Sequence, residues 1–555
     1  MIAIDMRPYS VIDSDGFREL IKVMDGRYSI PSRWFFSEKV IPEIYSEVKD
    51  AIKIDLSKAL PGISFTTDMW RSHQNIEYMV VTFHWTTLKD EMFQRRQALV
   101  SLEEFAEKAT SKHIRDRLTA IANEWVPANN QLLFGSSDNG ANIRRALIDC
   151  TKENMIRGWV PCIAHCLNLV MKGGIDTQRA VGDTISALRT LVSKVNNSQP
   201  VKRRFDELLG IHYPNTKHVK LTRDVETRWN STLTMLENIT SQRDAVEALA
   251  NDRVMTPFAD FSRPRAFQHW SDALDIISRV VAALKPAEEA IKLASQDDCS
   301  VSSFLPMVKG LAKQLQLLQD AGEVTGVISM VETFQNLWEK RMRWMMSPKP
   351  TSRIDYLEEE TIIATFHAAT VLDPRYKMKF APRDEIFRNK IKEAISTSVV
   401  GLSDNEKNLD DVVELSDPDT PEQATQLPSH SDRPSFMSAM EAAMMESSPS
   451  TSENEDETPA QSDIKKSIAH ELEVYLQQPV AKLDSNVLEY WSSRRQTFPN
   501  LAPVAAAYHA CPPSSVTAER MFSVAGDIVT KKRCSLTPHN LQRLAMIKVN
   551  KNYIE

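Results

Sequence analysis

Three runs near the N-terminus have the length and the apolar content that are typical of β-strands. They are "GISFTTDMW", "EYMVVTFHWTT" and "MFQRRQALVSLEEF". Polar turns separate them, which predicts a meander of three strands. The pattern then predicts a helix in "SKHIRDRLTAIANEW", a strand, turn and helix in "QLLFGSSDNGANIRRALIDC", and a short strand with a helix in "GWVPCIAHCLNLVMK". The order β-β-β-α-β-α-β-α indicates a mixed sheet with helices on its faces.

The pattern changes near residue 176 and stays different to about residue 400. Apolar residues recur there at intervals of three and four, as on one face of packed helices. Examples are "VGDTISALRTLVSKVNNS", "LTMLENITSQRDAVEALAND" and "SDALDIISRVVAALKPAEEAIKLASQ". The last 90 or so residues also predict helices, beginning with "IKKSIAHELEVYLQQ". Because 555 residues are too many for one core, we expect two or more domains.

A polar segment divides these two parts of the chain. Residues 401–463 hold 16 Asp and Glu, two basic residues and a single aromatic residue, Phe436. Such a composition cannot bury enough apolar surface to offset the entropy of ordering, so we expect disorder. Its net charge of −14, set against −7 for the whole chain, leaves +7 for the remainder. The overall charge therefore does not exclude a polyanionic partner.

The composition also limits the compartment. Six cysteines in 555 residues do not make a disulfide framework, which favours a reducing compartment, the cytosol or the nucleus. No run approaches 18 apolar residues, and the N-terminus lacks the layout of a signal peptide. We therefore expect no membrane partner.

Two acidic residues follow predicted strands. Asp68 ends "GISFTTD" and Asp138 follows "LLFGSS", so both could meet at one edge of the sheet. Two adjacent carboxylates repel each other, and a divalent cation removes that repulsion. With a third carboxylate they can hold two cations for in-line attack on a phosphodiester. The alternative is that both residues cap turns, for which "SSDNGANI" is a fair signal.

The segment "CIAHCLNLV" places Cys162, His165 and Cys166 within five residues. A structural zinc site would need a second pair of ligands at similar spacing, and the other cysteines do not supply one. We therefore expect no structural zinc. His165, near a strand end, could face a phosphate, or the segment could be a buried helix start with packed cysteines.

The segment "VETRWNST" places Arg228 beside Trp229. Arginine pairs with phosphate, and tryptophan offers a face on which a base can stack. The alternative is a packed tryptophan beside an arginine whose stem lies along apolar surface.

Glu519 lies on a predicted amphipathic helix in "SSVTAERMFSVAGDIVTKKR", where a glutamate is usually solvated or paired with a neighbour such as Arg520. Lys531, Lys532 and Arg533 form a short basic run, typical of a solvated loop or a weak phosphate patch.

Seven segments in this order resemble the hAT family of DNA transposases and the proteins derived from them. They are "MIAIDMRPYSVIDSDGFREL", "TTDMWRS", "SSDNGANI", "CIAHCLNL", "DVETRWNST", "VLDPRYK" and "EYWSSRRQTFPNLAPVAAAYHACPPSSVTAERMFSVAG". The resemblance covers almost the whole chain, and the last block resembles the dimerisation region of the family. It implies an RNase H-like core that is interrupted by a large helical insertion, so the fold class is α/β plus all-α.

The resemblance also implies roles for the residues above. The catalytic acids would be Asp68, Asp138 and Glu519, which would bind Mg²⁺ or Mn²⁺. His165 would lie near the scissile phosphate. Arg228 and Trp229 would contact DNA, with the tryptophan stacked on a flipped base.

The implied division of the chain has five parts. They are a helical lead-in (1–55), the first part of the RNase H-like core (56–175), a helical insertion (176–400), an acidic linker (401–464), and a dimerisation region that includes the last core helix (465–555).

Members of this family usually begin with a BED zinc finger that binds DNA, and this sequence has no such finger. Two hypotheses follow. The first is a nuclear, homodimeric or higher-order DNA-binding protein that cleaves and joins DNA. The second is a non-enzymatic regulator or scaffold of the same descent. Neither uses a small-molecule substrate. A plain helical interaction protein would instead keep the three acids far apart.

Overall fold

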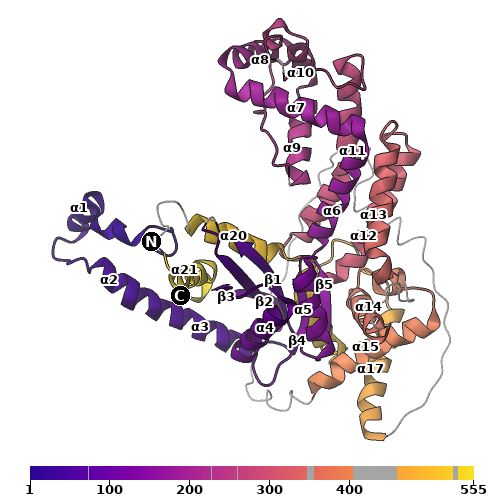
Figure 1. Cartoon of the computed structure of the whole chain (residues 1–555). Coiled ribbons are helices and arrows are strands. Elements are labelled where there is room, and N and C mark those ends of the chain that lie inside the picture. The colour runs from indigo at the N-terminus through magenta and orange to yellow at the C-terminus, as the bar shows by residue number, and fades with distance from the viewer. Residues whose placement is uncertain are drawn as a thin grey trace, which may run out of the picture.

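The computed structural model describes residues 1–554 except residues 73, 227, 259, 347–355, 404–458 and 529–535. A central sheet carries helices on its faces, and a helical arm, residues 163–294, extends away from it (Figure 1). In the described residues no helix is both long and apolar enough to cross a membrane.

The sheet has five strands in the order β3-β2-β1-β4-β5. β1, β2 and β3 pair antiparallel, whereas β4 and β5 run parallel to β1. This arrangement confirms the predicted order of elements and the RNase H-like sheet. The strands are β1 (Ile63–Arg71), β2 (Glu77–Lys89), β3 (Met92–Glu104), β4 (Leu132–Ser137) and β5 (Gly158–Pro161).

Helices from both ends of the chain cover the sheet. Lys548 Nζ donates a hydrogen bond to Ile4 O (2.7 Å), which holds the C-terminal helix beside the N-terminus. The lead-in is helical, as predicted, and two further helices follow the meander. The elements are η1 (Tyr9–Asp13), α1 (Asp15–Met24), α2 (Arg33–Phe35), η2 (Phe36–Val40), α3 (Ile41–Ser57), α4 (Ser111–Trp125) and α5 (Ala141–Lys152).

The region after β5 is helical, as the three- and four-residue spacing predicted. The stretch "LTMLENITSQRDAVEALAND" spans two helices, α9 and α10, because the chain turns at Ser241 and Gln242. The elements are α6 (Ile163–Thr177), α7 (Arg179–Asn197), α8 (Gln199–His212), α9 (Trp229–Thr240), α10 (Arg243–Ala250), η3 (Arg253–Met255), α11 (Trp270–Ala294), η4 (Val301–Ser303), α12 (Phe304–Asp320), α13 (Ile328–Met346), α14 (Tyr356–Val371), η5 (Lys377–Phe380) and α15 (Glu385–Ser403).

The C-terminal block does not pack as one unit. Its first helices share the hydrophobic core of the helical arm, whereas its last two share the core that joins the sheet to α3, α4 and α5. Most of the predicted acidic linker lies outside the described residues. The elements of this block are α17 (Pro459–Gln477), α18 (Val487–Ser493), α19 (Leu501–Ala510), α20 (Val516–Ile528), α21 (Pro538–Val549) and η8 (Lys551–Tyr553).

Candidate active site at the strand ends

The first two acids lie side by side on β1 and at the end of β4, two neighbouring strands in the middle of the sheet. The parallel strands β1 and β4 pair Thr66 with Ser136. Side chains alternate along a strand, so two residues further on Asp68 and Asp138 fall on the same face of neighbouring strands. Asp138 is the first residue after β4, as predicted. The prediction that Asp68 follows its strand is wrong, because Asp68 is the sixth residue of β1 and the strand continues to Arg71 by pairing with β2. The structure therefore brings together two acids that are 70 positions apart, as the sequence analysis expected.

Each of these carboxylates also accepts a local backbone hydrogen bond. The Met69 N–H donates to Asp68 Oδ1 (2.8 Å), and the Gly140 N–H donates to Asp138 Oδ1 (2.9 Å). The second bond closes the turn before α5, so the turn role considered for Asp138 is present. It occupies one oxygen of the carboxylate and is compatible with a second role.

The pair is strained electrostatically. Desolvation by burial, then the nearby Asp138 and, more weakly, Glu519 carboxylates raise the pKa of Asp68 to about 8, against the lowering effect of the Met69 N–H. Asp68 is therefore largely protonated at neutral pH when no cation is present. A group that titrates this far from its ordinary range, beside a second acid, is a marker of a functional site.

Glu519 approaches the pair from the first turn of α20. The chain before α20 is fixed there, because the Ile163 N–H donates to Pro513 O (3.2 Å) and the Cys162 N–H donates to Ser137 O (2.8 Å). The end of β4, the start of α6 and the start of α20 therefore meet. The Glu519 side chain is exposed, yet desolvation by the surrounding elements raises its pKa, while His165 and Arg228 lower it and Asp138 raises it.

His165 is half-buried in the first turn of α6, on the side of Glu519. The neighbouring cysteines are packed thiols. Burial raises the pKa of Cys162 to about 12, and burial likewise raises the pKa of Cys166 to about 11. Cys166 Sγ accepts a hydrogen bond from Asn139 Nδ2 (2.9 Å), which ties α6 to the turn after Asp138.

Arg228 and Trp229 have different surroundings. Arg228 is exposed before α9 and is close enough to Glu519 to lower the pKa of that carboxyl. Trp229 is only 3% exposed, within the core of the helical arm. This matches the alternative of a packed tryptophan, because in this conformation the ring offers no face to a base. The predicted stacking role would require the ring to leave the core.

Comparison with known proteins gives three matches along the chain. The descriptions are the ZBED1 RNase-like domain over residues 66–158, the ZBED1 RNase-like helical domain over residues 160–276, and the hAT family C-terminal dimerisation region over residues 471–550. Zinc finger BED domain-containing protein 4 of Homo sapiens is 24% identical over 99% of this chain and 43% of its own length. Zinc finger BED domain-containing protein 6 of Homo sapiens is 23% identical over 99% and 54%, respectively. The putative AC transposase of Zea mays is 24% identical over 98% of this chain and 63% of its own length.

The chain belongs to the hAT family of transposase-derived proteins. It spans about half the length of the first curated relatives that it matches. The region matched as the hAT dimerisation region contains α18, α19, α20 and α21, so Glu519 lies within it.

Two arginines that the sequence analysis missed also approach the site of this hAT protein. Gly174 allows α13 to pack against α6, since a Cβ there would lie 2.0 Å from the Phe334 ring. This packing carries Arg341, further along α13, to the start of α6. There Arg341 and Arg144 both act on the Cys166 thiol and lower its pKa, against the larger effect of burial. The position of Arg144, in the helical turn that follows "SSDNG", could have indicated that it lies near Asp138. The sequence around Arg341 gives no such indication.

Two of the three acids are placed to hold a divalent cation. In the described part of the chain, no three His, Cys, Asp or Glu side chains form a group that could hold a metal ion. Asp68 and Asp138 alone fit a hard cation, because they supply adjacent carboxylates that repel each other without one. Glu519 acts on the pair electrostatically but does not complete the set in this conformation.

We expect a cation to bind this pair more tightly as the pH rises. Since the pKa of Asp68 is about 8, binding below that pH displaces one proton. The affinity for Mn²⁺ should rise about tenfold per pH unit between pH 6 and 8, and then level off. Titration calorimetry in two buffers of different ionisation enthalpy measures the proton released. The control Glu107→Gln, at an exposed site, should show the same pH dependence as the original protein. An affinity that does not change between pH 6 and 8 in both proteins would contradict the prediction.

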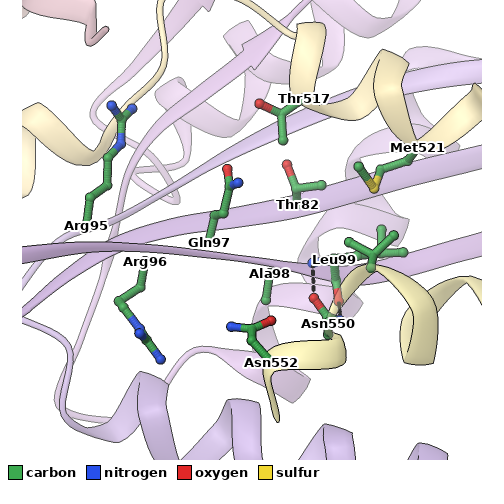
Figure 2. Close-up of a pocket in the computed structure, with 11 residues that line it drawn as sticks. Thr82, Arg95, Arg96, Gln97, Ala98, Leu99, Thr517, Met521, Asn550 and Asn552 are labelled. Carbon is green, nitrogen blue, oxygen red and sulfur yellow. Dashed lines mark hydrogen bonds between the residues drawn. The ribbon is translucent and has the colours of Figure 1, made fainter. Parts of the chain in front are cut away.

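A cavity of about 230 Å³ lies between α20 and the outer strands (Figure 2). Thr82, Gln97 and Thr517 face the same space. At its edge the Asn550 side chain bonds both backbone groups of Leu99, at 3.0 and 2.9 Å, as a neighbouring strand would. Polar and apolar residues line the cavity, and none of the three acids is among them. The cavity therefore leaves part of α20 unpacked but is not part of the site.

Proposed function

We propose that this hAT protein is a nuclear, DNA-binding homodimer that retains a divalent-metal-dependent site for DNA strand cleavage and transfer. The observation that carries the proposal is the pair Asp68 and Asp138 on adjacent parallel strands, with the pKa of Asp68 raised to about 8. Rigid strands fix the carboxylates, which a metal site for phosphodiester chemistry requires. The nucleus follows from the substrate, since a protein that acts on chromosomal DNA must reach it.

Asp68 and Asp138 would hold Mg²⁺ or Mn²⁺ between them, and Glu519 would join by rotation of its exposed side chain. The bound cation supplies activation of a water or 3′-hydroxyl and stabilisation of the leaving oxygen. His165 and Arg228 favour the ionised form of Glu519, since both lower its pKa. Arg228 places positive charge beside Glu519, and Arg144 and Arg341 place it beside Cys166 at the start of α6, which would suit a phosphate backbone.

The test is nicking of supercoiled plasmid DNA by the purified full-length chain with Mn²⁺. We expect open-circular product that disappears with EDTA. Glu519→Gln should reduce the rate at least about tenfold, because it removes one carboxylate at the site. The matched control is Glu489→Gln, an exposed glutamate in the first turn of α18. Absence of nicking in protein that binds DNA would overturn the cleavage activity.

A second candidate is a non-enzymatic regulator or scaffold of the same descent. Two observations favour it: Trp229 is packed in the core, and the described residues contain no complete three-ligand group. This candidate predicts that the protein binds DNA with equal affinity in Mn²⁺ and in EDTA and leaves plasmid DNA intact. The nicking assay therefore separates the two functions.

The dimer gives a further prediction. The match to a dimerisation region over residues 471–550 supports self-association. Most side chains of α19 are already buried within their own chain, so the contact must use other, exposed faces of the region. Light scattering should give a mass of about twice 62.9 kDa at micromolar concentration. A mass of a single chain over the whole concentration range would contradict it.

A further inference from the structure

The helix that carries Glu519 is held by a distant part of the chain. The loop between α11 and η4, residues 295–300, belongs to the helical insertion and lies against the start of α20. Arg520 Nη1 donates to Asp297 Oδ1 (3.0 Å), and Arg520 Nη2 donates to Ser295 O (2.7 Å). Arg520 directly follows Glu519, so these bonds act on the turn that presents the carboxylate.

A second arginine holds the same loop from the sheet side. Arg95 of β3 donates from Nη1 to Asp297 O (2.6 Å) and Cys299 O (2.9 Å). Its Nη2 donates to Ala510 O (2.8 Å), at the end of α19. One guanidinium therefore joins a strand of the core, the loop of the insertion and the segment that leads into α20.

Two more contacts continue along this segment. The Val301 N–H donates to Cys511 O (2.8 Å), and Ser300 Oγ and His509 Nδ1 are hydrogen-bonded (2.8 Å). Residues 509, 511 and 520 are thus bonded directly to residues 295–301 of the insertion, and residue 510 is joined to them through Arg95.

Packing against the sheet also supports α20, since the Phe522 ring stacks on Trp70 of β1 with the ring centroids 6.0 Å apart. Thr517 and Met521 line the cavity of about 230 Å³, so this side of the helix does not rest on a filled apolar surface (Figure 2). The fully buried side chains of α20 are Ala518, Ala525 and Ile528, and two of these three lie in its second half. The contacts of Arg520 therefore add a second support at the turn that carries Glu519.

We propose that the Arg520–Asp297 pair, supported by Arg95, is a latch through which the helical insertion sets the position of Glu519 at the active site. The inference rests on the proposed function, because it takes Glu519 to be a residue of that site. An exposed ion pair adds little to overall stability. Its effect here is on placement, and small errors in placement reduce a catalytic rate strongly. Arg520 and Asp297 are positioning residues; neither touches the acid pair.

The test is a charge exchange in the full-length protein. Arg520→Asp and Asp297→Arg should each lower the single-turnover nicking rate about tenfold and change DNA affinity by less than about twofold. The double variant should recover to within about threefold of the original rate. Recovery would exclude a direct effect of the carboxylate introduced beside Glu519, since the double variant keeps it. Failure of the double variant to recover would overturn the latch.

The control is Arg243→Asp, since Arg243 Nη1 forms a similar bond with Asp275 Oδ1 (2.6 Å) that joins α10 to α11. It should leave the nicking rate unchanged. Comparison at a temperature where circular dichroism shows every variant folded separates placement from loss of structure.

Hydrogen exchange gives a readout that does not depend on activity. The amides of residues 516–522 should exchange faster in each single variant and return to the original rate in the double variant. If the original protein does not nick DNA but this pattern appears, the proposed cleavage fails and the latch stands. If nicking is present but exchange and rate are unchanged in Arg520→Asp, the latch fails and the function stands.

Discussion

Asp68→Asn is expected to reduce metal-dependent nicking by about 10³-fold and, at the same time, to stabilise the metal-free protein. The loss follows because an amide is a poor ligand for a hard cation and cannot replace the carboxylate shared with Asp138. The gain follows because the site holds the Asp68 carboxylate in a position where burial and two other acids oppose its charge. Active sites commonly have this conflict between stability and activity.

The sign of the stability change depends on pH. The folded-state pKa of Asp68, about 8, lies above its ordinary value of 3.8. Such a group favours the folded state below its unfolded pKa, and that advantage is lost as the pH rises to the folded pKa. The variant should therefore match the original protein near pH 4 and exceed it by about 2 kcal/mol at pH 8, a figure reduced for solvent screening.

Calorimetric melting in EDTA at several pH values measures this difference. The control is Asp50→Asn, an exposed acid on α3, which should change the melting temperature little at any pH. A variant that loses nicking but is no more stable at pH 8 than at pH 4 would show that Asp68 is not electrostatically strained. A variant that still nicks DNA at the original rate would remove Asp68 from the site.

Local sequence patterns predicted the sheet and singled out the first two acids. The sheet was predictable because β1, β2 and β3 are short apolar runs bounded by polar turns, and most of their consecutive residues are buried. The sequence left open whether Asp68 and Asp138 meet or only cap turns, and the parallel pairing of β1 with β4 decides for their adjacency. The role of Glu519 had no local signal and came only from the resemblance to hAT proteins.

Features that depend on packing between distant segments were not predictable. Trp229 has the same local sequence whether its ring is packed or exposed, and only the surrounding helices bury it. Arg95 lies 415 positions from its partner Ala510, and nothing in either segment indicates the other. The division of the C-terminal block between two cores likewise results from tertiary contacts. Such contacts are set by the fold as a whole rather than by periodicity.

The segment "VLDPRYK", one of the seven that resemble the hAT family, has a structural role in this fold. Asp373 is fully buried at the end of α14, where Arg375 binds it with Nε to Oδ1 (2.9 Å) and Nη2 to Oδ2 (2.7 Å). The Ser302 hydroxyl donates to Asp373 Oδ2 (2.6 Å). Burial alone would raise the pKa of Asp373, but Arg375 outweighs it and the pKa is lowered. Ser302 lies in η4, directly after the loop of residues 295–300, so this ion pair holds the C-terminal end of that loop.

Asp373→Ala should therefore cost about 3–5 kcal/mol, because it leaves the Arg375 guanidinium buried without its partner. The double variant Asp373→Leu with Arg375→Met should cost less than the single one, since it removes both charges together and keeps apolar volume. The first transition in urea, followed by tryptophan fluorescence, measures the change. Asp484→Ala, at an exposed acid before α18, is the control and should stay within about 0.5 kcal/mol. A double variant less stable than Asp373→Ala would contradict this prediction. It would show that the unpaired Arg375 charge is not the main cost of the single variant.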